Sequence, residues 1–189
     1  HRYLSRCQYL LQKGLFGADI CYLAPEGSPH TIDGQSFSAR PESPPERPGN
    51  NFDVCPPEVV LTRMSVRDGR LVLPEGASYR LLALPQVETM TPGLLRKLRD
   101  LTAAGATVVG PRPIASPSLT GWPACDGELR ELADELWGAG SKPVDEVDRV
   151  VGKGRVIWEA GLARRSAADG QARLGKALCE TPYAGVSDD

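Results

Sequence analysis

The chain has 189 residues, of which 41% are hydrophobic and 24% charged, and its formal net charge is −2. That length is enough for one domain with a three-layer core. No basic run points to nucleic acid, and no apolar run approaches the roughly 20 residues that a membrane span needs.

The first fifteen residues predict a helix with Leu4, Cys7, Leu11 and Leu15 on one side. This helix starts at residue 1 without a cap, and the chain begins with neither Met nor a signal-peptide core. We therefore expect a piece of a longer protein, and the sequence leaves its compartment open.

A buried strand is predicted over 18–23, followed by a proline-rich loop at about 25–50. Six prolines exclude regular structure there, and a loop of this length is usually functional or disordered. A short helix over 57–63 and a hairpin over 64–73 follow. The turn of the hairpin is Asp68-Gly69, which favours two residues with positive φ.

The segment 79–109 is the strongest fold signal. An apolar strand over 79–84 leads to Thr91 as N-cap and Pro92 as first helical residue. Strand, helix and strand within about thirty residues form a right-handed βαβ unit. The helix over 92–104 should bury one leucine face, end at Gly105 and be followed by a strand over 106–109; that face comprises Leu94, Leu95, Leu98 and Leu101.

Beyond this unit, Asp126 is predicted to cap a helix whose inner face includes Leu129 and Leu136 and which ends before Gly138. A hairpin over 148–158 follows, and residues 160–189 read as a weakly helical tail. The sum is an α/β domain over 1–159: a three-layer sandwich with three or four parallel strands, helices on both faces and a β-hairpin insertion.

In such sheets, ligands gather beyond the carboxyl ends of the strands. We expect the polar residues at that edge to be partly exposed and clustered, with Glu88 and Arg112 near a common point. The candidate edge residues are Glu26, Gln86, Glu88, Arg112 and Ser116, with His30 in the proline-rich loop.

No autonomous catalytic set emerges from the residues. A nucleophilic cysteine would need a strained strand-to-helix turn, and neither Cys21 nor Cys125 has that context. The carboxylates of Glu26 and Glu88 could serve a glycosidase, but nothing in the sequence predicts their separation. Five scattered cysteines and two histidines make a metal site improbable, and no cofactor is expected.

Two further motifs have simple structural interpretations. Gly152-Lys153-Gly154 lacks the spacing of a phosphate-binding loop and is better explained as a hairpin turn. Trp137 and Trp158 are expected in the core. Trp122, in a loop, could stack on a sugar ring.

Several segments resemble one family, the large α-L-rhamnosidases of glycoside hydrolase family 106. The match covers roughly residues 2–158, in order and spacing. The matching segments are Arg2 to Gly14 with Ala18-Asp19, Val66 to Pro74, Tyr79 to Leu95, Gly105 to Pro111 with Pro113, and Gly152 to Val156.

The resemblance implies a flavodoxin-like, class I glutamine amidotransferase-like fold without its nucleophile, located after the catalytic barrel. The family's hydrolytic acids belong to that barrel, so no catalytic residue is carried over. The implied role is a non-catalytic accessory domain whose partners are the catalytic barrel domain of the parent enzyme and a rhamnose-containing carbohydrate. Alternatives are a free-standing binding or interaction module that has lost the barrel and an independent hydrolase using Glu26 and Glu88.

Overall fold

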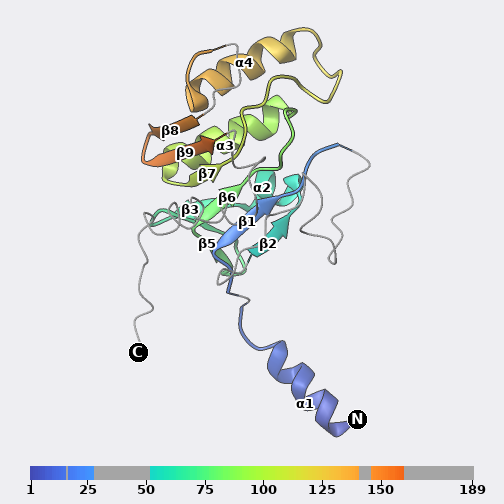
Figure 1. Ribbon diagram of the computed structural model, residues 1–189. Helices are drawn as coiled ribbons and strands as arrows, with labels where there is room; N and C mark the ends of the chain where they lie inside the picture. The colour runs from blue at the N-terminus through green and yellow to red at the C-terminus, as the bar shows by residue number, and fades with distance from the viewer. Residues whose placement is uncertain (16, 28–51, 141–145, 160–189) are drawn as a thin grey trace.

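The computed structural model describes residues 1–15, 17–27, 52–140 and 146–159. A six-stranded sheet with the order β2-β1-β6-β7-β9-β8 forms the centre, and a three-stranded sheet β3-β4-β5 lies beside it (Figure 1). The elements in chain order are α1 (Arg2–Leu11), β1 (Ile20–Leu23), β2 (Phe52–Cys55), α2 (Pro57–Arg63), β3 (Ser65–Arg67), β4 (Arg70–Val72), β5 (Ser78–Tyr79), β6 (Leu81–Ala83), α3 (Pro92–Ala104), β7 (Thr107–Val109), α4 (Ala124–Trp137), β8 (Glu146–Val151) and β9 (Gly154–Glu159).

The predicted βαβ unit is confirmed. Strands β1, β6 and β7 are parallel neighbours, with Cys21 aligned to Leu82 and Leu82 aligned to Val108. The parallel part of the sheet is larger than expected, because β2 pairs with β1 and β9 pairs with β7, also in parallel. Only the edge strand β8 runs antiparallel, as one arm of the β8–β9 hairpin.

Two details of the strands differ from the sequence reading. The expected single strand over 79–84 is divided, because Tyr79 pairs with Leu71 in the smaller sheet and β6 begins at Leu81. Strand β2, over 52–55, was not predicted. It is short, contains Asp53 and follows the proline-rich stretch, so the sequence gives no clear periodicity there.

Helices α2, α3 and α4 pack on one face of the large sheet, where they share one apolar cluster with alternate strand residues such as Leu82 and Val108. The expected leucines of α3 and α4 are all buried. The opposite face carries a second cluster of strand residues that includes Ile20 and Leu81. The described residues place no helix on this second face, so the three-layer sandwich stays a prediction.

Helices α3 and α4 begin with different capping residues, and only the cap of α3 is the one predicted. The hydroxyl of Thr91 caps α3 by accepting a hydrogen bond from the Leu94 N–H, and Gly105 ends the helix with φ of 127°. The prediction that Asp126 caps α4 is wrong. The helix begins at Ala124 with Pro123 at the N-cap position, three residues earlier than predicted, and Asp126 lies inside the first turn.

Both predicted hairpin turns are confirmed. Asp68 and Gly69 have φ of 52° and 74°, as a two-residue turn of this kind requires. In the second hairpin, Val151 pairs with Gly154, so Gly152 and Lys153 form the turn. A Cβ at Gly154 would overlap the backbone of Thr102 and Ala106, which explains why the chain has glycine there.

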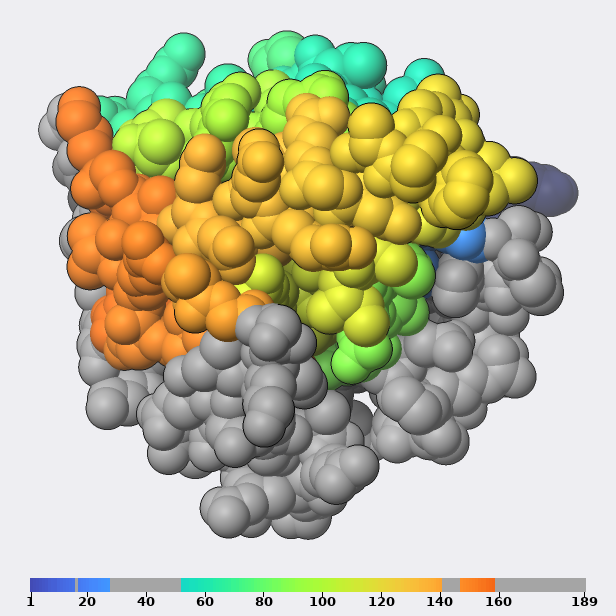
Figure 2. All heavy atoms as spheres, turned by 90° about the horizontal axis from the view of Figure 1, so that it is seen from above, coloured from blue at the N-terminus to red at the C-terminus, as the bar shows by residue number. Residues whose placement is uncertain are grey.

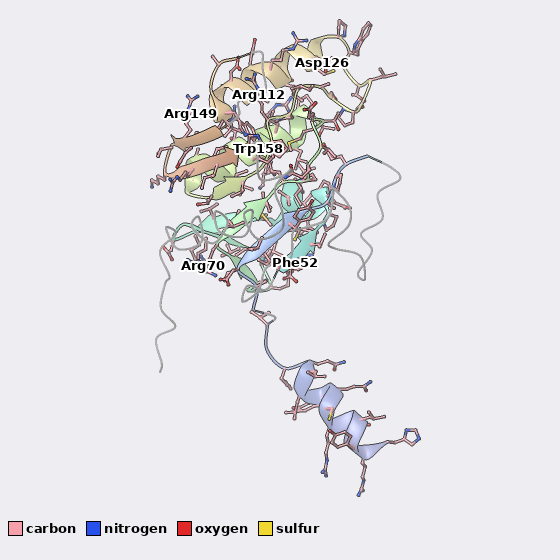
Figure 3. All side chains as sticks on the ribbon, in the orientation of Figure 1. Phe52, Arg70, Arg112, Asp126, Arg149 and Trp158 are labelled. Carbon is pink, nitrogen blue, oxygen red and sulfur yellow. The ribbon has the colours of Figure 1, made fainter. Side chains whose placement is uncertain are left out.

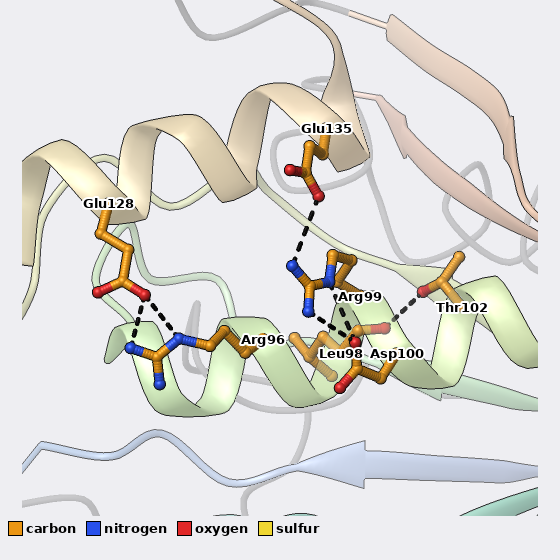
Figure 4. A network of polar contacts seen from close by, with 7 residues as sticks. All are labelled: Arg96, Leu98, Arg99, Asp100, Thr102, Glu128 and Glu135. Carbon is orange, nitrogen blue, oxygen red and sulfur yellow. Dashed lines mark hydrogen bonds and ion pairs between the residues drawn. The ribbon is translucent and has the colours of Figure 1, made fainter.

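On the outer surface, α4 and the loop before it cover much of one side of the molecule, next to the β8–β9 hairpin (Figure 2). Arg96 of α3 contacts Glu128 of α4, and Arg99 pairs with Asp100 and, at 3.8 Å, with Glu135 (Figure 4). These ion pairs are solvent-exposed, so each contributes at most about 1 kcal/mol. Within the described part of the chain, no helix is long and apolar enough to cross a membrane.

Candidate functional site

The carboxyl ends of β1, β6 and β7 lie at one edge of the sheet, because these strands are parallel neighbours. The described segments that leave this edge are 24–27, 84–91 and 110–123, and we call them the rim loops. Backbone hydrogen bonds prolong the sheet into them: the Ala24 N–H donates to Cys55, and the Leu84 N–H donates to Val109. The rim loops therefore begin from a rigid base.

Glu26 connects the first rim loop to helix α3. Its carboxylate accepts one hydrogen bond from the Thr91 N–H and another from the Thr91 hydroxyl, each 2.6 Å long. A negative charge is favoured at a helix N-terminus, where backbone N–H groups lack intrahelical partners. Both oxygens of Glu26 are thus engaged in holding the start of α3.

The second and third rim loops are paired through their backbones. The Ile114 N–H donates to the Glu88 carbonyl at 2.8 Å, and the Met90 N–H donates to the Ala115 carbonyl at 3.1 Å. Thr89 and Ala115 form a parallel bridge. These contacts fix the backbone around Glu88, whose side chain is exposed, while Gln86 earlier in the same loop is half-buried.

Ser116 and the start of α4 are also joined. The Ser116 N–H donates to the Asp126 carboxylate at 3.0 Å, so Asp126 holds the third rim loop against α4 instead of capping the helix. On both sides of this contact the loop exposes apolar side chains. Ile114, Leu119 and Trp122 are 49%, 85% and 65% exposed.

Arg112 is tied to the far end of α4. Its side chain is only 9% exposed, and its guanidinium contacts the Asp134 carboxylate at 2.5 Å. It also donates to the carbonyls of Gly138, at 3.2 Å, and Gly140. Figure 3 shows Arg112 between α4 and the sheet. The guanidinium is therefore engaged in holding the C-terminal end of α4.

The structure thus brings Glu26, Glu88 and Ser116 onto connected rim loops and points the Arg112 guanidinium toward α4. A common action of the five candidate residues stays a prediction. Trp137 and Trp158 are buried, as expected, and the Trp137 indole N–H donates to the Gly110 carbonyl at 3.0 Å.

The cysteines expected to be inert, Cys21 and Cys125, are both buried. Cys21 is fully buried in β1, and its hydrogen bond with Cys55 together with burial raises the pKa of the Cys21 thiol. Cys125 is buried in the first turn of α4. Among the described residues, no group of three or more His, Cys, Asp or Glu side chains could hold a metal ion.

A neighbouring polar contact joins the two sheets. The hydroxyl of Tyr79 in β5 donates to the Asp53 carboxylate in β2 at 3.0 Å. Burial, reinforced by this hydrogen bond, raises the pKa of the Tyr79 phenol. The pair anchors the hairpin insertion to the edge of the large sheet.

The sequence did not reveal the side chains that bind the candidate residues Glu26, Ser116 and Arg112. Thr91 was identified as a cap, but its pairing with Glu26 spans 65 positions and leaves no local signal. Asp126 was identified as a helix cap and not as the acceptor for the Ser116 N–H, and Asp134 was not singled out. Arg112 lies 22 positions before Asp134, so no local pattern joins the two.

Comparison with known proteins places the chain in a family. The family described as alpha-L-rhamnosidase, glycoside hydrolase family 106, matches residues 1–173. The chain belongs to this family.

Two similar proteins are much longer than this chain. A Formosa agariphila protein named "Putative beta-glucuronidase" is 34% identical over 151 residues, which is 79% of this chain and 12% of that protein. The solved structure of a rhamnosidase from Novosphingobium sp. PP1Y is similar with a TM-score of 0.66 and 29% identity, covering 93% of this chain and 15% of that one. The chain therefore spans only a small part of each relative.

Proposed function

We propose that this chain is a non-catalytic accessory domain of a glycoside hydrolase that resembles α-L-rhamnosidases. Its rim loops would border the active site or a contact between domains. The fold assignment that accompanies this proposal is a three-layer, class I amidotransferase-like sandwich. The observation that carries the proposal is a rigid, paired rim in which the described candidates Glu26 and Arg112 are engaged in holding helices α3 and α4.

The contacts of the candidate residues support a structural role. Both oxygens of Glu26 are engaged by Thr91, and Arg112 is engaged by α4. A carboxylate committed to a helix N-terminus is poorly placed to act as a general acid or nucleophile. The exposed Glu88 is then the rim residue best able to reach a neighbouring pocket.

The exposed apolar residues of the third rim loop support a neighbour at this edge. Ile114, Leu119 and Trp122 lie within nine residues of one another on a loop whose base is fixed by Glu88 and Asp126. Aromatic side chains that present an apolar face beside polar groups suit both sugar stacking and domain contacts. The partner would be the catalytic barrel of the parent enzyme, with a rhamnose-containing carbohydrate between them.

The test compares the 189-residue chain with the longer gene product that contains it, using an aryl α-L-rhamnoside. We expect turnover by the longer protein and none by the chain. In the longer protein, Glu88→Ala should raise KM or lower kcat without changing thermal stability. Glu131→Ala, an exposed position of α4, is the matched control and should change neither constant.

Turnover by the isolated chain that Cys21→Ser or Cys125→Ser abolishes would contradict the proposal. A free-standing binding module is the alternative, and it would be favoured by a gene that encodes no barrel upstream.

A further inference from the structure

The third rim loop ends in an uncharged segment, residues 116–123, that presents a tryptophan to solvent. All three tryptophans of the chain are described, and Trp122 is 65% exposed whereas Trp137 and Trp158 are buried. The segment contains no Asp, Glu, Lys, Arg or His. In Figure 2 the yellow stretch that precedes α4 projects at one end of the molecule. The fold thus holds an indole ring outward on a neutral loop.

The backbone fixes this indole on a tight turn. The Trp122 N–H donates to the Leu119 carbonyl at 3.1 Å, and Gly121 has a φ of 75°, which a type II turn requires at its third position. The Cys125 N–H then donates to the Gly121 carbonyl at 3.0 Å, so the turn continues directly into α4. A ligand that binds here meets a backbone that is already ordered, which lowers the entropic cost of binding.

The turn 119–122 combines two apolar side chains with a hydroxyl group. Leu119 and Trp122 are its two ends and are therefore close together, and Leu119 is 85% exposed. Between them, the exposed Thr120 hydroxyl accepts a hydrogen bond from the Ser118 hydroxyl at 2.9 Å. A hydroxyl has one donor and two acceptor sites, so this contact leaves the Thr120 proton available to a ligand.

This combination fits a neutral sugar better than other ligands. A pyranose ring has C–H groups on one face, which suit an aromatic plane, and uncharged hydroxyls around its edge. A 6-deoxyhexose such as rhamnose adds a methyl group that an exposed leucine can contact. Nucleic acid would need Lys or Arg for its phosphates, and a typical protein partner would need about 800 Å² of surface on each side, far more than one turn offers.

We propose that the turn 119–122 is a carbohydrate-binding site that this domain has on its own. Trp122 stacks on the ring of a neutral 6-deoxyhexose, Leu119 contacts the methyl group of the sugar, and the Thr120 hydroxyl donates to one of its hydroxyls. The inference rests on the proposed function for the class of sugar, because the family is described as alpha-L-rhamnosidase. It goes further in that the 189-residue chain binds the sugar without a catalytic barrel.

Tryptophan fluorescence tests the site directly. Acrylamide should quench mainly Trp122, since Trp137 and Trp158 are buried. Methyl α-L-rhamnoside should protect Trp122 from quenching in a saturable way, with an affinity in about the millimolar range because one ring on an open surface buries little area. Methyl α-L-mannoside, which differs by a hydroxyl at C6, should bind about three-fold more weakly or worse, because its C6 group is polar. No protection by about 100 mM rhamnoside, or equal affinity for the two sugars, would overturn the assignment.

Substitutions provide a second measurement, with ligand-observed NMR as the readout of rhamnoside affinity. Trp122→Ala should weaken binding by about ten-fold or more through loss of the stacking surface. Thr120→Val removes the hydroxyl at nearly constant shape and should weaken it by about three-fold or more. Thr62→Val, at an exposed position of α2, is the matched control and should keep the affinity. All three positions are exposed, so the melting temperature should stay unchanged. Unchanged affinity of the Trp122→Ala variant would contradict the proposal.

Two other occupants of the turn give different results. Shielding of Trp122 in sugar-free solution that grows with protein concentration would show a second copy of the chain. Hydroxyl-radical footprinting of the longer gene product would show a contact within the parent if Trp122 is shielded there while the 189-residue chain binds no rhamnoside. Either result would overturn the carbohydrate site. Because binding by the 189-residue chain needs no turnover, its failure is distinguishable from a failure of the Glu88 test.

Discussion

The two oxygens of the Glu26 carboxylate accept hydrogen bonds from the backbone N–H and the hydroxyl of Thr91, both at 2.6 Å. One residue at the end of β1 thereby holds the start of α3, and the Thr91 hydroxyl in turn accepts from the Leu94 N–H. The end of a central strand and the N-terminus of the crossover helix form one connected unit.

Thr91→Ala should destabilise the chain by about 0.5–2 kcal/mol, because the cap is lost and Glu26 loses its hydroxyl partner. Urea denaturation measures the change. In a double-mutant cycle with Glu26→Gln, we expect a coupling energy of about 0.5–3 kcal/mol. Thr89→Ala, exposed two positions earlier, is the control and should have little effect. Additive effects of the two substitutions would contradict the connection.

Leu98→Ala should cost about 2–5 kcal/mol of unfolding free energy, because the Leu98 side chain is fully buried between α3 and the sheet. Chemical denaturation of the 189-residue chain measures it. Arg130→Ala, at an exposed position of α4, should stay within about 0.5 kcal/mol of the parent sequence. An unchanged midpoint for Leu98→Ala would show that the helix register is wrong.

Stability should fall in alkaline solution partly through Tyr79. The pKa of its phenol is raised above the ordinary value of 10.0 by burial and by the hydrogen bond to Asp53, so the folded chain holds this proton more tightly than the unfolded chain does. The resulting stabilisation is complete below pH 10 and is lost as the pH rises through the folded-state pKa.

We therefore expect the unfolding free energy of the Tyr79→Phe variant to decline less above pH 10 than that of the original chain. Near pH 7 the variant should be less stable by about 1 kcal/mol, because the hydrogen bond to Asp53 is lost. Tyr3→Phe, at an exposed position, should keep the original pH profile. Parallel profiles for the Tyr79→Phe variant and the original chain would rule out this contribution.

Two glycines should respond oppositely to alanine. At Gly127 in α4, a Cβ meets nothing within 4 Å, so Gly127→Ala should stabilise the chain by about 0.5–1 kcal/mol. At Gly154 the Cβ would overlap rigid backbone, so Gly154→Ala should cost about 3 kcal/mol or more. Thermal unfolding of both variants compares them. A tolerated Gly154→Ala would contradict the close approach of β9 to the end of α3.

Local signals predicted most of the fold. The leucine spacing of α3, the Thr91-Pro92 start and the Asp68-Gly69 turn each depend on neighbouring residues, and the structure confirms all three. Strand β2 was not predicted, because the whole proline-rich segment separates it in sequence from its partner β1. The true start of α4 was not predicted, because Asp126 is a typical capping residue but instead accepts a hydrogen bond from the Ser116 N–H in the loop that precedes the helix.

The sequence predicted where the candidate site lies but not the contacts of its residues. Parallel strands put their carboxyl ends at one edge, so the sequence could identify which residues leave it. The sequence could not show which of these residues already have partners, because the partners lie far away in the chain. Glu26 accepts a hydrogen bond from Thr91, and Arg112 forms an ion pair with Asp134. The apolar side of α1 was visible in the helical spacing, but only the structure shows that the rest of the described chain leaves this side exposed.

Strand β1 is aligned with Phe52 of β2 on one side and with Leu81 of β6 on the other, and both partners follow it in the chain. During synthesis, its four buried residues therefore leave the ribosome before either neighbouring strand exists. The β3–β4 hairpin can form from local contacts in the meantime, whereas β1 stays open to other chains until β6 and its crossover helix arrive. A nascent chain that stalls before Leu81 would present an apolar strand with at least one free edge, which is a site for aggregation.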